Sequence, residues 1–400
     1  MQEGSLLSDP GVPSLSPGLS SHPADRLGLA GWIALGAGLP AMGAALVLDP
    51  HAVAAAAAQD WAPFVLVTGL LALGLVARDD GLFDAAGSLL SRGARGAGSL
   101  FVGAAILVAL VTAVLNLDTA VAFLTPLVVV AARRRRTDDV PFLYLVVFLA
   151  NGASLVLPGS NLTNLIVLGD VHQSGSAFAS TMVLPWLASA GAVTVGVGML
   201  WRRSLHAAGS RVTDRVEWRA GAGLFGVATV VTAMLVLTST WAAAVAAAVG
   251  AAAAAWSLAK RRTTISELRR TVSVPVLAGL FVLAVDLGTL GRVWDGPTRV
   301  LAHASFVVTA VVGALASVVV NNLPAASLLA ARPLAHPHAL LVGLDLGPNL
   351  AITGALSAVL WLQVSRTIGA RPSLRRYTTA GAVIVPVSMA LALSALAAAH

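Results

Sequence analysis

The chain has 400 residues, of which 57% are hydrophobic and only 11% are charged, whereas about a quarter of the residues in a typical soluble domain are charged. Because so few charged side chains cannot cover a water-soluble protein of this size, we expect an integral membrane protein with most of its length in lipid. The sequence contains no cysteine, which excludes disulfide bonds, thiolate metal sites and cysteine catalysis.

The formal net charge of +7 comes from arginine, since Lys260 is the only lysine. The arginines stand in short clusters between apolar runs, and this pattern is typical of a multi-pass membrane protein whose positive loops face the cytoplasm. We therefore attribute the charge to membrane topology and expect no binding to nucleic acid.

Residues 1–26 form a polar segment rich in serine and proline, which predicts a disordered cytoplasmic tail. Because the tail has no apolar stretch, we expect no cleaved signal peptide. The apolar runs that follow are mostly long enough to cross a membrane. They lie at about 27–48, 61–77, 99–115, 117–132, 140–169, 178–200, 220–239, 241–259, 274–290, 301–320, 323–331, 339–365 and 377–399.

Two regions predict re-entrant hairpins rather than simple spans. In region 99–132, two short apolar arms meet at Asn116, Leu117 and Asp118. In region 301–332, the arms meet at residues 321–324, which read Asn-Asn-Leu-Pro. A polar tip at mid-membrane depth is tolerated only where it is buried in protein or faces a wet cavity.

Each hairpin precedes a long apolar segment that is interrupted in its middle. Segment 140–169 is interrupted by Asn151 and Gly152 and again at residues 158–161, which read Pro-Gly-Ser-Asn. Segment 339–365 is interrupted at residues 347–349, which read Gly-Pro-Asn. Because proline removes a helix hydrogen bond and glycine weakens a helix, we expect two discontinuous helices.

The basic residues also predict a topology. With a cytoplasmic N-terminus, and with both hairpins returning to the side from which they start, every basic residue except Arg292, Arg299 and Arg332 lies inside. This arrangement gives an all-α, multi-pass protein of the cell membrane with nine spans, two hairpins and an external C-terminus.

The predicted elements recur in the same order in the two halves of the chain. The first inverted repeat covers residues 27–200, a linker with a connecting helix covers 201–240, and the second inverted repeat covers 241–400. Inverted repeats with broken helices are typical of secondary transporters, which bind substrate where the repeats meet.

Polar side chains gather at the two hairpin tips and the two helix breaks, where half-helix ends can bind solutes or ions. The candidate substrate-binding residues are Asn116, Asp118, Thr119, Asn151, Ser160, Asn161, Thr163, Asn164, Asn321, Asn322, Asn349 and Thr353. For each asparagine the alternative is a structural role, in which the amide caps a helix end or joins two helices.

Asp118 and Asp345 are the candidate proton-coupling residues. An ionisable side chain at membrane depth predicts a functional site, and burial disfavours the charged form, which suits a group that binds a proton reversibly. The alternative for both is a carboxylate that caps a broken helix.

The sequence has no Gly-x-x-x-x-Gly-Lys-Ser/Thr loop for nucleotide binding and no recognisable pair of nucleophile and base. We therefore expect neither an enzyme nor a cofactor or a resident metal. The energy for transport must then come from an ion gradient or from a partner protein.

Four stretches, spread over most of the chain, carry a family resemblance. They are residues 80–92, 117–126, 153–164, and 321–324 with 345–348. They resemble the arsenite efflux permeases (arsenical pump membrane proteins) of the ion transporter superfamily, which also includes sodium/proton antiporters and di/tricarboxylate carriers. The resemblance implies re-entrant hairpins, an elevator-type motion, proton-coupled efflux of neutral arsenite or antimonite and, for some members, a soluble arsenite-stimulated ATPase as partner.

We therefore expect a proton-coupled exporter of arsenite or antimonite, because a neutral solute with hydroxyl groups suits a site lined by amides. A sodium/proton antiporter and a carrier of di- or tricarboxylates are the alternatives. The carboxylate carrier is disfavoured because Asp118 would repel an anion and no embedded arginine offsets it. The expected partners are a small inorganic solute, a coupling ion (proton or sodium) and membrane lipid, and a homodimer stays open.

Overall fold

The computed structural model describes residues 22–169, 173–206 and 221–399. The protein is all-α, as predicted, since the regular structure of the described residues is helical and contains no strand. The first half of the chain forms α1 (His22–Leu48), α2 (Pro50–Asp79), α3 (Leu82–Gly93), α4 (Ala97–Val114), α5 (Leu117–Arg134), α6 (Val140–Gly152), the 3-10 turn η1 (Pro158–Ser160), α7 (Leu162–Val167), α8 (Gly175–Leu200) and α9 (Arg202–Leu205).

The second half of the chain is also entirely helical where the structure describes it. It forms α10 (Ala222–Val236), α11 (Ser239–Ala259), α12 (Ile265–Val272), α13 (Val274–Val293), α14 (Gly296–Ala302), α15 (Phe306–Val320), α16 (Asn322–Leu329), α17 (Pro337–Leu346), the 3-10 turn η2 (Gly347–Leu350), α18 (Leu356–Thr367) and α19 (Leu374–Ala398).

The disordered tail was predicted to extend to residue 26, whereas α1 already begins at His22. Pro23 does not oppose this start, since proline fits the first turn of a helix, where its missing N–H has no partner to lose. Residues 1–21 of the predicted tail, and most of the predicted cytoplasmic loop 201–219, lie outside the described residues.

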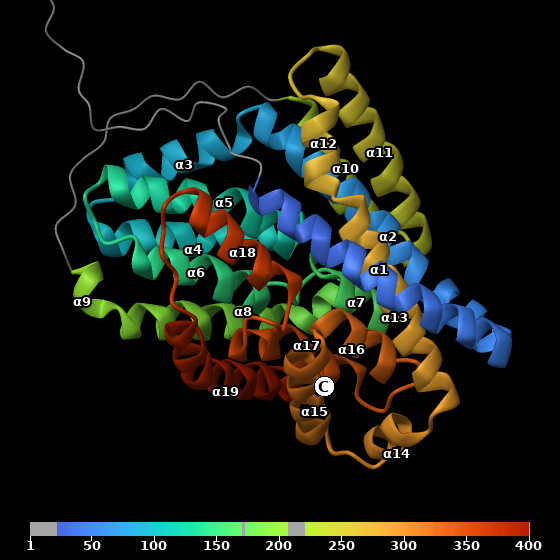
Figure 1. Cartoon of the computed structure of the whole chain (residues 1–400). Coiled ribbons are helices and arrows are strands. Elements are labelled where there is room, and N and C mark those ends of the chain that lie inside the picture. Colours follow the sequence, from blue (N-terminus) through green and yellow to red (C-terminus); the bar gives the residue numbers. More distant parts are fainter. Residues whose placement is uncertain (1–21, 170–172, 207–220, 400) are drawn as a thin grey trace, which may run out of the picture.

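The helices form two groups that lie side by side (Figure 1). The long-helix bundle consists of α1, α2 and α10 to α13, and the hairpin bundle consists of α4 to α8 and α15 to α19. The two bundles meet where α16 packs against α13 and where α5 and α7 pack against α2. The hairpin tips and helix breaks therefore lie close to the boundary between the bundles.

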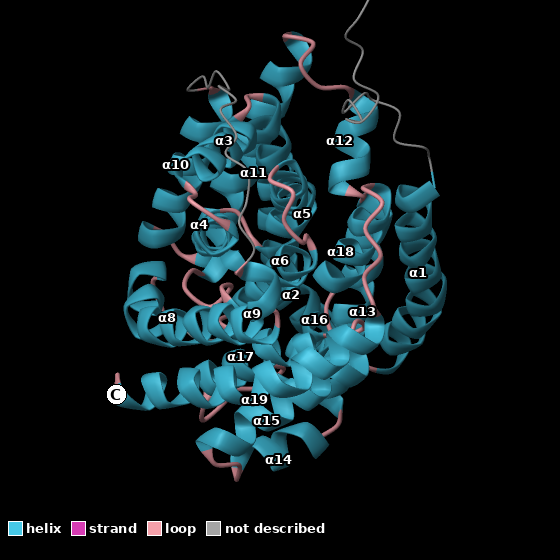
Figure 2. Cartoon of the chain, turned by 90° about the vertical axis from the view of Figure 1, so that its left-hand side faces the viewer, coloured by secondary structure: helices cyan, strands magenta, loops and turns pink. Residues whose placement is uncertain are grey.

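Helix contacts come in corresponding pairs. Helix α2 packs on α11 as α13 packs on α1, α4 packs on α6 as α15 packs on α17, and α5 packs on α18 as α16 packs on α7. Helix α8 packs on its own counterpart α19, and the two run alongside each other in Figure 2. A repeat that matches α1–α8 with α11–α19 would produce these pairs, while the opposite membrane orientation of the halves stays a prediction.

Six helical segments of the described residues are long and apolar enough to cross a membrane: Pro50–Asp79, Ala97–Val114, Gly175–Leu200, Thr240–Ala259, Ile265–Val293 and Leu374–Ala398. Four shorter apolar helices are Ala34–Leu48, Val140–Gly152, Ala222–Val236 and Phe306–Val320. Five of the six long segments coincide with predicted spans. The sixth, α4, is the first arm of the first predicted hairpin.

The two hairpins differ in length. Helices α4 and α5 have 18 residues each, close to the minimum for a span, whereas α15 and α16 have 15 and 8 residues. The first arm of each hairpin exposes an apolar stripe at helical spacing, with Val102, Ile106 and Leu110 on α4 and with Val311 and Leu315 on α15. These stripes suit contact with lipid, and the return of the hairpins within the membrane stays a prediction.

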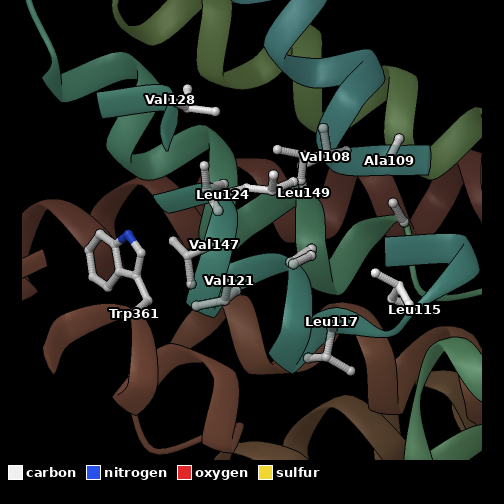
Figure 3. Close-up of a cluster of buried hydrophobic side chains, with 14 of the residues drawn as sticks. Val108, Ala109, Leu115, Leu117, Val121, Leu124, Val128, Val147, Leu149 and Trp361 are labelled. Atoms are coloured by element: carbon white, nitrogen blue, oxygen red, sulfur yellow. The ribbon is translucent and has the colours of Figure 1, made fainter. Parts of the chain in front are cut away.

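Helix α6 forms the centre of the hairpin bundle, and its residues Pro141–Gly152 are all buried. Figure 3 shows Val147 of α6 beside Leu124 of α5 and the Trp361 indole of α18. The Trp361 indole is fully buried and donates its N–H to the carbonyl oxygen of Leu143 at 2.8 Å. A helix enclosed on all sides by protein can carry polar residues at its end without exposing them to lipid.

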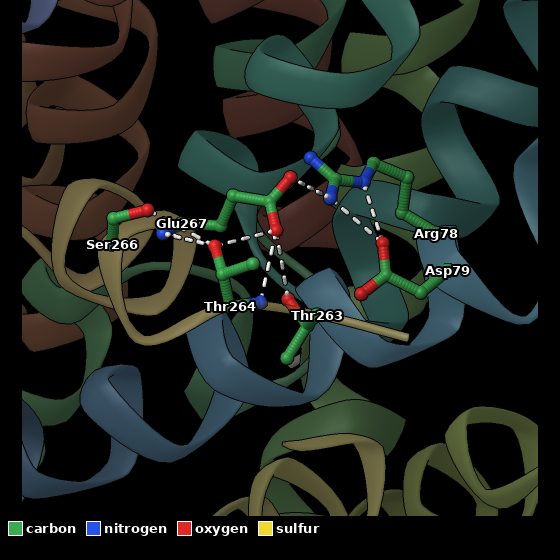
Figure 4. A network of polar contacts seen from close by, with 6 residues as sticks. All are labelled: Arg78, Asp79, Thr263, Thr264, Ser266 and Glu267. Atoms are coloured by element: carbon green, nitrogen blue, oxygen red, sulfur yellow. Dashed lines mark hydrogen bonds and ion pairs between the residues drawn. The ribbon is translucent and has the colours of Figure 1, made fainter. Parts of the chain in front are cut away.

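Charged side chains gather where α2 ends and α12 begins (Figure 4). Arg78 pairs with Asp79 at 2.7 Å and with Glu267 at 3.6 Å, and Glu267 forms a capping box with Thr264 at the start of α12. Arg262 binds Asp80 at 2.8 Å. This cluster lies on the predicted cytoplasmic side, where charges can remain in contact with water.

Close packing of α15 on α17 depends on Gly343, because a Cβ atom at this position would overlap the backbone of Ala310. We expect Gly343→Ala to destabilise the protein by about 1–3 kcal/mol, the usual cost of overpacking. The control is Gly191→Ala on α8, where a Cβ atom meets nothing within 4 Å and removal of a helical glycine should be neutral or stabilising. Thermal unfolding of both variants in detergent tests this, and equal melting temperatures would contradict it.

Candidate functional site

The first helix break separates α6 from α7. Helix α6 ends at Gly152, the chain continues through η1, and Asn161 then caps α7 by accepting a hydrogen bond from the Thr163 N–H at 3.2 Å. Pro158 begins η1 and has no N–H with which to continue a helix. The predicted interruption at residues 158–161 is therefore present.

The second break separates α17 from α18. Helix α17 ends at Leu346, η2 follows with Pro348 in its first turn, and the chain is extended at Ala351 and Ala355 before α18 begins. The predicted interruption at Gly347, Pro348 and Asn349 is therefore present as well.

Asp345 is fully buried at the end of α17 and joins the two breaks. Its carboxylate accepts hydrogen bonds from Thr163 Oγ1 at 2.7 Å, Asn161 Nδ2 at 2.8 Å and Ser154 Oγ at 3.1 Å. Three donors from the first half thus converge on one carboxylate of the second half. Asp345 therefore lies directly beside the second break.

A second polar link joins Asn151 and Asn349. Asn151 Nδ2 donates to Asn349 Oδ1 at 2.8 Å, and Asn349 Nδ2 donates to the Phe148 carbonyl oxygen at 2.9 Å. Ser357 Oγ of α18 donates to Asn151 Oδ1 at 3.2 Å. Both asparagines are fully buried and hydrogen-bond to each other. This contact corresponds to the alternative role considered for them, in which an amide joins two helices.

The two hairpin tips are built in the same way. Asn116 has φ of 149° with ψ of 172°, and Asn321 has φ of 78° with ψ of 148°, a region that residues other than glycine rarely adopt and that occurs mainly at functional sites. Asn116 Oδ1 accepts a hydrogen bond from the Thr119 N–H at 2.7 Å, and Asn321 Oδ1 accepts one from the Leu323 N–H at 3.4 Å. Each asparagine therefore both turns the chain and caps the second arm.

The first tip retains polar atoms without a partner. Within the described residues, Asn116 Nδ2, Asp118 Oδ1 and Thr119 Oγ1 are buried and have no hydrogen bond. Buried polar atoms are nearly always paired in native proteins. Of the three residues Asp118 lines the pocket described next, so its Oδ1 atom is a candidate contact for a solute or an ion.

A pocket lies where the two tips and the two breaks meet. It is lined by Leu117, Asp118, Asn161, Leu162, Leu280, Asn321, Asn322, Leu323, Ala355, Leu356 and Ser357. Among these lining residues Asp118 is the only charged one, and Asn161, Asn321 and Asn322 supply amides. Asp345 lies directly behind Asn161, within hydrogen-bonding distance of it.

Some predicted site residues lie away from this pocket. Asn164 Nδ2 donates to the Ser154 carbonyl oxygen at 2.7 Å, and Ser160 Oγ donates to the same oxygen, so both hold the loop of the first break. The Thr119 methyl group packs toward Gly74 of α2. Thr353 Oγ1 donates to the Val318 carbonyl oxygen at 3.5 Å and is exposed.

Several polar residues near the site were missed by the sequence analysis. Ser154 donates to Asp345, and Ser357 donates to Asn151. A single serine in an apolar segment gives too weak a signal to be recognised as a site residue. Asp60 is 1% exposed. It stands just before the predicted apolar run 61–77, whereas α2 extends back to Pro50.

Comparisons with known proteins agree with this architecture. A model of the citrate transporter family (CitMHS) matches residues 27–352. An arsenical pump membrane protein of Yersinia enterocolitica is 26% identical over 84% of this chain and 86% of its own length. An uncharacterized transporter of Mycobacterium tuberculosis is 26% identical over 83% of this chain and 85% of its own.

A solved structure shares the fold. The YdaH transporter of Alcanivorax borkumensis, described as having an unusual topology, superposes with a TM-score of 0.53 and covers 94% of this chain and 98% of its own. At 15% identity this likeness supports the fold alone.

Proposed function

Because the chain belongs to the citrate transporter family and is a multi-pass membrane transporter, we propose that it exports a small neutral oxyacid, arsenite or antimonite, in exchange for protons. The observation that carries the proposal is the lining of the pocket, which contains three asparagines and a single carboxylate. Amides can donate and accept hydrogen bonds, as the hydroxyl groups of a neutral oxyacid require.

The charge of the pocket favours a neutral solute over a carboxylate. Asp118 is its charged residue, and neither arginine nor lysine lines it. An ionised citrate would meet a like charge without compensation, and at a separation of about 4 Å this repulsion reaches roughly 4 kcal/mol at an intermediate dielectric. The similarity to an arsenical pump membrane protein points the same way.

Citrate is the second candidate, because the matching family is described as citrate transporter. Uptake assays in inverted membrane vesicles with arsenite, antimonite, citrate and sodium side by side distinguish the candidates. Uphill accumulation of arsenite or antimonite, driven by an imposed pH gradient, supports the proposal. Accumulation of citrate alone, or exchange of sodium for protons without any solute, would overturn it.

For the mechanism we propose that the hairpin bundle moves against the long-helix bundle and carries the pocket across the membrane. The support is the position of the pocket, which is lined by both hairpin tips and both breaks and receives only Leu280 from the long-helix bundle. A site carried almost wholly by one group of helices can change sides without being taken apart.

The proposed orientation can be tested in intact cells, because the native chain has no cysteine. We expect Arg136→Cys to resist an impermeant maleimide added from outside and Ala335→Cys to react with it, since both residues are exposed and are predicted to face opposite sides. Neighbouring Arg135 is 1% exposed and would report nothing. Labelling of position 136 from outside would reverse the topology.

A further inference from the structure

Asp60 is a buried carboxylate that belongs neither to the hydrogen bonds around Asp345 nor to those between Asn151 and Asn349. It lies in α2, the residue is 1% exposed, and neither of its oxygens has a hydrogen-bond partner among the described residues. An ionised carboxylate without hydrogen-bond donors is costly inside a protein. Its position therefore suits a carboxyl group that holds a proton in this conformation.

The surroundings of Asp60 place it at the boundary between the two bundles. Ala56, one helical turn earlier, shares its face of α2, and a Cβ atom at Gly288 would contact the Ala56 side chain at 3.2 Å, Arg292 Nη1 at 3.4 Å and the Ser327 side chain at 3.7 Å. Ser327 belongs to α16 of the second hairpin and Arg292 to α13. Both side chains therefore lie beside the face of α2 that carries Ala56 and Asp60.

Arg292 is the charged side chain beside this face of α2, since the other charged residue of α13, Asp286, lies against Gly38 of α1. Helices α7, α10 and α11 carry no charged residue, and α1 carries none between Leu27 and Leu48. The charges of α12 lie beside Arg78 and Asp79 at the other end of α2, where α3 also packs. Thr119 of α5 contacts Gly74 of α2, far along the helix from Asp60.

The neighbouring residue Gln59 fastens the two bundles together. Gln59 Nε2 donates to the carbonyl oxygens of Ile166 and Ala330, each at 3.0 Å, so that it holds the C-terminal ends of α7 and α16. Gln59 Oε1 accepts a hydrogen bond from Arg292 Nη2 at 2.7 Å. We call this arrangement of Gln59, Arg292 and the two carbonyl oxygens the clasp.

We propose that Asp60 is a proton-binding site of the transport cycle, distinct from Asp118 and Asp345, and that loss of its proton opens the clasp. When the carboxyl group releases its proton to water, the resulting carboxylate attracts the Arg292 guanidinium away from Gln59, because a charge-assisted hydrogen bond is stronger than one to a neutral amide. Gln59 then no longer holds α7 and α16 firmly, and the hairpin bundle can move. This coupling rests on the proposed proton-driven transport.

A proton is a better ligand for this site than a metal cation. The polar side chains beside this face of α2 are the Ser327 hydroxyl, which donates to the Leu323 carbonyl oxygen, and the Arg292 guanidinium. A sodium or calcium ion requires several oxygen ligands and would be repelled by Arg292. Adding sodium at constant pH should therefore leave the site unaffected.

The test follows the conformation through a single cysteine at Leu280, which lines the pocket from α13. Its maleimide labelling rate is divided by that of Arg136→Cys at the same pH, which removes the intrinsic pH dependence of the thiol. Between about pH 5.5 and about pH 8 we expect this ratio to change about tenfold, within the usual range for coupling between two sites. Addition of sodium at constant pH should not change it.

Three variants assign the effect. Asp60→Asn should keep the low-pH ratio at every pH, and Gln59→Ala should keep the high-pH ratio at every pH. Asp286→Asn is the matched control, since its carboxylate oxygens are also buried and unpartnered but lie close to Gly38 of α1 rather than α16. We expect the control to behave like the unsubstituted chain.

The outcomes separate this inference from the proposed function. A normal pH dependence in Asp60→Asn, or none in the unsubstituted chain, would overturn the role of Asp60. If Asp60→Asn does not fold, a normal pH dependence in Gln59→Ala would overturn the clasp. If vesicles export neither arsenite nor antimonite while the labelling depends on Asp60 as described, the substrate is wrong and the proton site stands.

Discussion

Replacing Asp118 by asparagine is expected to abolish uphill export while downhill flux of the solute remains. Asp118 is the charged residue of the pocket, and its Oδ1 atom is buried without a partner. A fixed charge at the bilayer centre costs at least about 2.5–3.5 kcal/mol, so protonation would favour movement between the two sides. Asparagine keeps the shape of the side chain but cannot exchange a proton.

The measurement is solute flux into inverted vesicles with and without an imposed pH gradient. Asp84→Asn is the control, because Asp84 is an exposed carboxylate of α3 that does not line the pocket. Asp118→Asn vesicles that still concentrate the solute at the normal rate would show that another group couples transport. Asp345→Asn should impair coupling less, because Asp345 is already engaged by three donors.

Replacing Asp345 by leucine is expected to destabilise the protein more than any other single substitution considered above. The change strands Asn161 Nδ2 and Thr163 Oγ1, which are buried donors to this carboxylate, whereas Ser154 Oγ keeps the Asn151 carbonyl oxygen as an acceptor at 2.8 Å. Each buried donor left unpaired costs about 1–3 kcal/mol. Because these donors hold the first break against the second, the loss should also separate the two halves at the site.

Thermal unfolding in detergent, followed by tryptophan fluorescence, measures this effect. Asp286→Leu is the matched control, because its carboxylate is buried on α13 without a hydrogen bond and its removal strands no donor. We expect Asp345→Leu to unfold at a markedly lower temperature than the unsubstituted chain and Asp286→Leu to unfold at nearly the same one. Similar melting temperatures for the two variants would show that the network contributes little.

The local features of the site could be predicted from the sequence because each depends on a few adjacent residues. Pro158 and Pro348 interrupt their helices whatever surrounds them, and Asn116 and Asn321 mark the turns between apolar arms. Helix ends were less predictable. The predicted apolar run begins at residue 61 and leaves Asp60 out, whereas α2 continues back to Pro50 with Ala52, Val53 and Ala56 buried.

The partners of the site residues could not be predicted, because they depend on contacts between distant parts of the chain. Asn161 was expected to line a site, and it does line the pocket, but its amide also binds Asp345, 184 residues away. Asn151 and Asn349 were expected to bind solute, whereas in this conformation they bind each other. A polar side chain in a membrane segment must have a hydrogen-bond partner, but its position in the sequence does not identify that partner.

The burial of α6 has a consequence for biosynthesis. This helix has 13 residues, too few to cross a bilayer that requires about 20. The hydrogen-bond partner of its Asn151 is Asn349, which is synthesised 198 residues later. At translation rates of about 5–20 residues per second, the delay is roughly 10 to 40 seconds. During that time the nascent first half must keep α6 sheltered by its neighbours or by the insertion machinery, so chains that stop before α17 should be recognised by membrane quality control and degraded.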